Sequence, residues 1–279
     1  METVSTLSIV FICISMAISF LLPVFLLVWA KIKRQIEWTP VLFGLLGFFI
    51  FTVIIKHYLD IFFLHQNAST SDLFFASPFL YMLYNGFTLA IFETAARFLI
   101  IFFLFKKYRD YNCGTLYGLG HGGLESILLS GFQMANYLIY TTYINTNNFD
   151  ALVTAAGSEI EKAYLTHMRE MLITIPSIDL LLPGLERFVA LAVQISLAIL
   201  VFCALKRKKY FLIGLSVLFQ AVYTFPSSLY EAKAFDSMIL MFLLNLAVGL
   251  LITGVSYYIY NRSNIEDNNY TQIYNKNTD

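Results

Sequence analysis

The segment "LERFVALAVQISLAILVFCALKRKK", residues 185–209, carries the pattern that decides the fold of this chain. Between Arg187 and Lys206 it holds no charged residue, and its most polar side chain is Gln194. A helix that crosses a bilayer needs roughly 20 mostly apolar residues. The segment therefore predicts a membrane-spanning helix over residues 185–205, followed directly by four basic residues.

The same pattern recurs along the whole chain. Of its 279 residues 58% are hydrophobic and only 13% are charged, whereas soluble domains carry about 25% charged residues. The formal net charge is zero, so nothing indicates a nucleic-acid partner. We expect an all-α, polytopic membrane helix bundle. Seven spans are predicted, at about residues 5–30, 39–64, 79–105, 115–143, 185–205, 210–229 and 236–260.

Basic residues predict the orientation of these spans. Twelve Lys and Arg residues flank the spans on one side of the membrane and three on the other, and the richer side is expected to face the cytosol. We therefore expect the N-terminus outside the cell and the C-terminus in the cytosol. Residues 1–260 form the predicted transmembrane domain, and 261–279 form a polar, disordered cytosolic tail. The twelve are Lys31, Lys33, Arg34, Lys106, Lys107, Arg109, Lys206, Arg207, Lys208, Lys209, Arg262 and Lys276.

The longest segment on the predicted outer side, residues 144–184, has mixed helical patterning until Pro176 and Pro183 interrupt it. Two interpretations stay open. It forms an amphipathic helix on the outer face of the membrane, or it is an ordinary ordered loop.

Polar side chains inside the predicted spans gather at one depth. Glu93, Glu125, Gln194 and Gln220 each lie 11 to 15 residues from the loop on the predicted cytosolic side. At a rise of ~1.5 Å per residue they sit roughly 15–20 Å from that boundary, near the bilayer centre. Charged residues nearer the span ends are expected to reach the interface and to be structural. These are Lys56, His57, Asp60, Glu186 and Arg187.

Two pairs in this layer share a helix face. Glu93 and Arg97 are four residues apart, as are His121 and Glu125. Around His121 the stretch "YGLGHGGLES", residues 117–126, holds four glycines, including Gly122. Such residues let another helix or a peptide approach closely. The layer could be packing alone, but four spans that each bury polar groups indicate a site, because each burial costs free energy.

These residue types point to water activation. A deprotonated glutamate can accept a proton from a water that attacks a carbonyl, and a histidine can stabilise the oxyanion or protonate the leaving group. A catalytic zinc usually has three protein ligands, and this layer offers a single histidine beside its two glutamates. No metal or other cofactor is therefore expected, and zinc is the weaker alternative.

Three stretches carry a resemblance to a known family. They are "IFETAARFLIIFFLFKK" (91–107), "YGLGHGGLESIL" (117–128) and "GLERFVALAVQISLAILVFCALKRKK" (184–209). The chain resembles the YhfC family of bacterial membrane proteins, classed as intramembrane metalloproteases or as relatives of the glutamic-type CAAX-processing/bacteriocin-immunity (CPBP) peptidases. The resemblance extends from the third predicted span to the sixth.

The resemblance maps unevenly onto this sequence. Glu93, Arg97, His121 and Glu125 match the family's motif residues, while Thr94 stands in place of a second glutamate. The family's later histidines are replaced here by Gln194 and Gln220, and its following acidic or amide residue by Thr224. Because glutamine can donate a hydrogen bond but is not an ordinary metal ligand, these replacements argue against a metal.

The leading interpretation is an intramembrane peptidase of the glutamic type that acts on a membrane peptide or membrane protein. Glu93 would activate water, Arg97 would hold Glu93, His121 would bind the oxyanion, and Glu125 would orient His121. Thr94, Gly122, Gln194, Gln220 and Thr224 would line the site. Two alternatives are a pseudoprotease that binds a membrane peptide without cleaving it and a transporter with a buried ion-pair layer.

Overall fold

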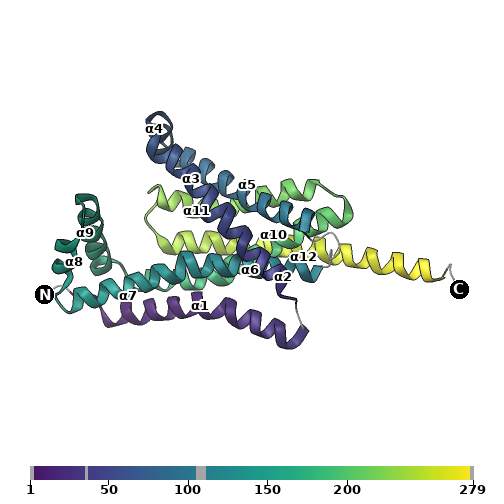
Figure 1. Ribbon diagram of the computed structural model, residues 1–279, viewed down its shortest axis with the longest axis horizontal. Coiled ribbons are helices and arrows are strands. Elements are labelled where there is room, and N and C mark those ends of the chain that lie inside the picture. The colour runs from purple at the N-terminus through teal and green to yellow at the C-terminus, as the bar shows by residue number, and fades with distance from the viewer. Residues whose placement is uncertain (1–2, 35–36, 105–110, 277–279) are drawn as a thin grey trace. The chain divides into compact units, whose positions relative to one another are not determined.

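The computed structural model describes residues 3–34, 37–104 and 111–276, and every regular element in them is helical (Figure 1). Its α-helices are α1 (Thr6–Arg34), α2 (Trp38–Phe48), α3 (His57–Asp60), α4 (Ala68–Phe75), α5 (Pro78–Leu104), α6 (Tyr111–Glu125), α7 (Phe132–Asn145), α8 (Phe149–Ala155), α9 (Glu159–Thr174), α10 (Leu182–Arg207), α11 (Phe211–Glu231) and α12 (Met238–Lys276). Short π-helical segments, η1 (Phe49–Lys56), η2 (Ile61–Gln66) and η3 (Ser126–Gly131), interrupt the longer helices, and a 3-10 turn, η4 (Ser177–Leu180), precedes α10. The chain is an all-α membrane helix bundle, as predicted.

Six helical segments within the described residues are long and apolar enough to cross a membrane. They are Thr6–Lys33, Trp38–Gln66, Pro78–Leu104, Ser177–Arg207, Phe211–Glu231 and Met238–Ser263, close to six of the predicted spans. The remaining prediction, residues 115–143, is helical as α6, η3 and α7. It is not among the six, because glycine and polar side chains lower its hydropathy.

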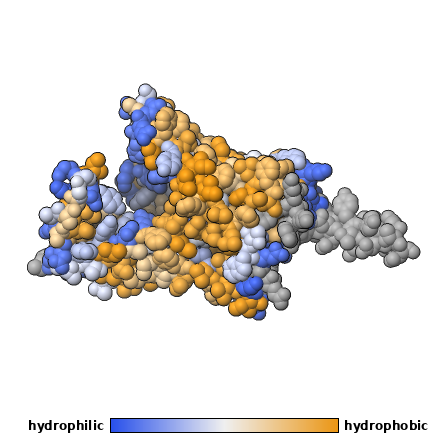
Figure 2. All heavy atoms as spheres, in the orientation of Figure 1, coloured by the Kyte–Doolittle hydropathy of each residue, from blue (hydrophilic) through white to orange (hydrophobic). Residues whose placement is uncertain are grey.

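The distribution of side chains is that of a membrane protein. Leu21, Phe25 and Leu250 are exposed, whereas Glu93 and Arg97 are buried. Figure 2 shows apolar side chains covering much of the visible face. Exposing so much apolar surface to water is unfavourable, whereas contact with lipid tails is not. This surface is therefore the kind that faces a bilayer.

The chain divides into two compact units, and the first comprises Met1–Val28 and Glu125–Phe188. Its core joins α1 to α7 and includes Ile12, Met134 and Leu180. Polar contacts add to this packing: Ser15 Oγ donates to the Leu180 carbonyl at 2.6 Å, and Ser19 Oγ donates to Ser130 Oγ at 2.8 Å. Hydroxyl bonds of this kind satisfy polar atoms inside an apolar bundle.

Residues 144–184, predicted to form either an amphipathic helix or an ordered loop, contain the helices α8 and α9 and the 3-10 turn η4. Ser158 caps α9 by accepting a hydrogen bond from the Glu161 amide at 3.2 Å, and Glu161 Oε2 accepts from the Gly157 amide at 2.9 Å. These bonds satisfy amides that the helix start would otherwise leave without partners. Leu165 and Leu172 of α9 are buried in the core of the first unit. The helix therefore packs on protein.

The second unit comprises Trp29–Leu124 and Val189–Asp279 and contains α2, α5, α11, α12 and most of α6 and α10. Glycines of α6 make close packing possible. A Cβ atom on Gly118 would lie 2.5 Å from Ile195 Cα, and one on Gly120 would overlap the Val41 carbonyl. The glycine-rich stretch thus lets α6 approach α2 and α10 at backbone distance.

The last helix differs from the prediction. Helix α12 continues to Lys276, where the sequence predicted a disordered tail from residue 261. The domain boundary at residue 260 and the orientation of the termini stay predictions. Lys106, Lys107 and Arg109, which support that orientation, lie outside the described residues.

Candidate functional site

A buried ion pair on α5 forms the centre of the site. Glu93 and Arg97 lie one helical turn apart, and Arg97 Nη2 donates to Glu93 Oε2 at 2.8 Å. The Arg97 side chain is fully buried, and that of Glu93 is 2% exposed. Taking both charges out of water is costly, and a close pair with further hydrogen bonds offsets that cost.

Two glutamines complete the surroundings of the pair. Gln194 of α10 donates from Nε2 to Glu93 Oε2 at 3.1 Å, and its Oε1 accepts from Arg97 Nη2. Gln220 of α11 also offers its Oε1 to Arg97 Nη2, at 3.3 Å. Both glutamines are buried. An amide has one acceptor and two donors, so Gln194 can bind the carboxylate and the guanidinium together and fix both rotamers.

His121 of α6 faces the same carboxylate. Its Nε2 lies 3.5 Å from Glu93 Oε2, and its ring packs edge-on against Phe48, with centroids 5.2 Å apart. The side chain is fully buried, and neither ring nitrogen forms a hydrogen bond within the described part of the chain. Arg97 Nε and Nη1 are likewise buried without a hydrogen bond there. These buried nitrogens can therefore bind a further polar partner.

The structure brings most of the predicted residues together. Glu93, Arg97, His121, Gln194 and Gln220 form one contact network within the second unit. The other predicted lining residues are less involved. Gly122 packs against Gln194, where an added Cβ would lie 2.9 Å from the Gln194 Cβ. Thr94 is buried beside Glu93 in sequence, and Thr224 donates to the Gln220 carbonyl at 2.9 Å.

Glu125, predicted to orient His121, lies one turn beyond it at the end of α6. The carboxylate 3.5 Å from His121 Nε2 is that of Glu93, and the orienting role of Glu125 stays a prediction. Glu125 Oε1 lies 3.7 Å from Arg187 Nη1. Arg187, predicted to reach the interface, is 9% exposed, and it also pairs with Glu186 at 3.5 Å. An arginine near the end of a membrane helix can be buried when a carboxylate lies beside it.

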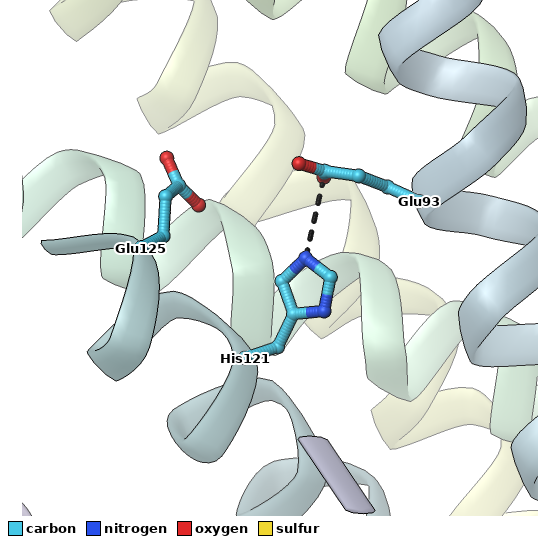
Figure 3. A group of neighbouring side chains, drawn as sticks. All are labelled: Glu93, His121 and Glu125. Carbon is cyan, nitrogen blue, oxygen red and sulfur yellow. Dashed lines mark ion pairs between the residues drawn. The ribbon is translucent and has the colours of Figure 1, made fainter. Parts of the chain in front are cut away.

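Three side chains could hold a metal ion. Glu93, His121 and Glu125 each offer one ligand atom, and these atoms lie within 4.8 Å of one another. Figure 3 shows the three side chains directed toward one another, with Glu125 one turn beyond His121 at the end of α6. Three protein ligands of these types match the number that catalytic zinc uses. The donor set therefore fits a metal by number and type.

The arginines beside these carboxylates argue against a metal ion. Glu93 Oε2, the oxygen that faces His121, already accepts hydrogen bonds from Arg97 and Gln194. An arginine also lies beside Glu125. Each candidate carboxylate therefore already has a cationic partner, which would repel a metal ion a few ångströms away.

The burial of two basic side chains, Arg187 and Lys56, was not predicted from the sequence. Arg187 lies seven residues before Gln194, which places both on one face of α10, and this spacing could have revealed it. Lys56 and Asp60, four residues apart, form a 2.6 Å ion pair in which Lys56 is 7% exposed, and their predicted place at the membrane interface stays a prediction. Their spacing on one helix face indicated the pair.

The fold and this network define a polytopic helical membrane protein with a buried site of carboxylate, guanidinium, imidazole and amide groups. Comparison with known families agrees: the chain belongs to the YhfC intramembrane metalloprotease family, whose model matches residues 18–245. It is an integral membrane protein of an intramembrane protease family.

One curated relative is similar over most of both chains. It is the "Uncharacterized membrane protein YhfC" of Bacillus subtilis (strain 168), 33% identical over 228 residues. The match covers 82% of this chain and 87% of the relative. No solved structure matches the chain.

Proposed function

We propose that this protein is an intramembrane peptidase that hydrolyses a membrane-embedded peptide bond with water activated by Glu93. The observation that carries the proposal is the contact between Glu93 and His121, 3.5 Å apart and both buried. A base beside a group that can donate to an oxyanion is the minimum that water attack requires.

The proposed step assigns one role to each side chain. Because Glu93 Oε2 accepts from Arg97 and Gln194, the proton from water would go to Oε1. The water oxygen then bonds to the carbonyl carbon, and His121 donates to the oxyanion. Collapse breaks the C–N bond, and the proton on Glu93 passes to the departing amine. The products are one carboxylic acid and one amine.

Arg97 would act through Glu93. A guanidinium at 2.8 Å favours the ionised carboxylate, and the two glutamines hold the guanidinium in place. Its buried Nε and Nη1 groups could also donate to a substrate carbonyl. Preorganised donors of this kind cost little reorganisation during the reaction.

Metal assistance is a second candidate mechanism, favoured by the approach of Glu93, His121 and Glu125 within 4.8 Å. A metal held by these residues would polarise the carbonyl and lower the pKa of a bound water. The arginine beside each carboxylate supports the metal-independent mechanism instead.

A second candidate function is peptide binding without cleavage. It is favoured by Gln194 and Gln220, which replace histidines of the family pattern and both bind Arg97. Glutamine cannot transfer a proton as histidine does. Such a pseudoprotease would retain a membrane peptide at the same site.

Cleavage of a reporter transmembrane peptide by purified protein in nanodiscs tests the proposal. Glu93→Gln should abolish cleavage while thermal unfolding still shows a folded protein. Glu159→Gln, at an exposed carboxylate of α9, is the matched control and should retain the wild-type rate. Full activity in Glu93→Gln would discard Glu93 as the base. Peptide binding that depends on His121, with no cleavage of any peptide, would favour the pseudoprotease.

A further inference from the structure

A second group of polar side chains, with buried Lys56 at its centre and partly buried partners around it, lies in the second unit toward the first residues of α5. Lys56 Nζ donates to Asp60 Oδ2 at 2.6 Å and to Asn85 Oδ1 at 3.0 Å. Tyr84 donates to Asp60 Oδ1 at 3.0 Å. Lys56 ends the π-helical segment η1, and such segments occur frequently at functional sites.

Helix α11 connects this group with the site. Asn85 Nδ2 donates to Ser228 Oγ at 2.9 Å, Ser228 Oγ donates to the Thr224 carbonyl at 3.1 Å, and Thr224 Oγ1 donates to the Gln220 carbonyl at 2.9 Å. Gln220 in turn contacts Arg97. Ser228, Thr224 and Gln220 are spaced by four residues, so they form one polar line on α11.

A further polar contact lies where α5 begins and α11 ends. Tyr81, near the start of α5, donates to Glu231, the last residue of α11, at 3.0 Å in an exposed contact. Tyr81 lies 12 residues before Glu93, which corresponds to about 18 Å along the helix. Figure 1 shows α5 and α11 side by side, and they share extensive contacts. Polar groups thus extend from the helix ends to the buried carboxylate.

We propose that these residues form a path by which water reaches Glu93. The polar line is defined as Tyr81, Asn85, Ser228, Thr224 and Gln220, with the Lys56–Asp60 pair beside it. The inference rests on the proposed function for its purpose, because each hydrolysis consumes one water: its oxygen goes to the acyl carbon, and its two hydrogens are shared between the acid and amine products. Lipid tails supply no water, and polar residues inside membranes mark such pathways.

Helix packing accounts for the contacts of Asn85 and Tyr81, which join α5 to α11. The Thr224 hydroxyl instead donates within α11, as hydroxyls in helices can do. A hydroxyl oxygen retains acceptor lone pairs after donating its proton, so Thr224 can still accept from a water. The Lys56–Asp60 pair also carries a desolvation cost that a neutral contact would avoid.

Cysteine accessibility tests the path in nanodiscs, where both faces meet solvent. In a background without Cys13, Cys113 and Cys203, the Thr224→Cys and Ser228→Cys variants are treated with a charged thiosulfonate. The matched control is Leu218→Cys, at a position 49% exposed on α11. The thiosulfonate reacts with the thiolate, and a cysteine ionises to the thiolate only where water reaches it. We therefore expect Thr224→Cys and Ser228→Cys to react at least ~10-fold faster than the control.

A second arm blocks the path. Adding Asn85→Leu should slow modification of Thr224→Cys while that of Leu218→Cys stays unchanged. Equal rates at all three cysteine positions would overturn the proposal, as would an undiminished rate at Thr224→Cys in the Asn85→Leu background. Labelling needs no proteolysis. Fast labelling of Thr224→Cys and Ser228→Cys without peptide cleavage would therefore count against the proposed function alone. Peptide cleavage without fast labelling would count against this inference alone.

Discussion

Arg97 Nη2 lies 2.8 Å from Glu93 Oε2, one helical turn away, and the two side chains have almost no solvent exposure. Gln194 hydrogen-bonds to both members of the pair. A buried pair of this kind is strongly destabilised when one member is removed, because the other charge stays buried. The pair should therefore show energetic coupling as well as a catalytic effect.

A double-mutant cycle on this pair measures that coupling. Arg97→Met should lower the free energy of unfolding by about 3–5 kcal/mol, because Glu93 remains buried without its cation. Glu93→Gln/Arg97→Met should recover part of that loss. Unfolding in detergent micelles provides the measurement. The control is Lys162→Met, which removes an exposed pair with Glu159 on α9 and should cost less than about 1 kcal/mol. Equal effects of Arg97→Met and Lys162→Met would contradict a buried, coupled pair.

The glycines of α6 give a prediction about packing. Gly118→Ala should destabilise the protein by about 1–3 kcal/mol, because its Cβ would meet the backbone of α10 at Ile195. Gly214→Ala on α11 is the matched control, since nothing lies within 4 Å of an added Cβ there. Thermal unfolding of both variants decides the point. Comparable stability of the two variants would show that α6 and α10 separate easily at Gly118.

His121 gives a prediction about rate. His121→Gln should reduce peptide cleavage by about 10²–10³-fold, the usual effect of losing one oxyanion donor. His57→Gln, at an exposed histidine on α3, should leave cleavage unchanged. The two rates are compared under single-turnover conditions, which separate chemistry from peptide binding. If His121→Gln changes only the affinity for the peptide, His121 serves in binding.

The sequence predicted the helical membrane fold and the grouping of Glu93, Arg97, His121, Gln194 and Gln220, because depth in a membrane helix follows from residue count. It did not predict the partners within that layer. Which carboxylate faces His121 depends on helix rotation and packing, and neither can be derived from the depth of a residue. The burial of Lys56 and Arg187 did not follow from the sequence for a related reason: depth does not show whether a neighbouring helix supplies a partner.

Orientation in the membrane gives a further prediction. The excess of basic residues predicts that a cysteine at Asn148 is labelled by an impermeant reagent from outside the cell and one at Asn268 only after the membrane is opened. A background free of native cysteines is required. Protection of both positions, or labelling of both in intact cells, would refute the predicted placement of the termini.

Metal dependence separates the two mechanisms. We expect cleavage to persist after treatment with a strong chelator, because Arg97 and Gln194 already occupy Glu93 Oε2 and an arginine pairs with each candidate carboxylate. Glu125→Gln should then slow cleavage less than Glu93→Gln does, since Glu125 would not touch the reacting atoms. Metal analysis of the purified protein should find less than one equivalent of zinc. Loss of cleavage on chelation, restored by zinc and absent in Glu125→Gln, would instead establish the metal-assisted mechanism with Glu93, His121 and Glu125 as ligands.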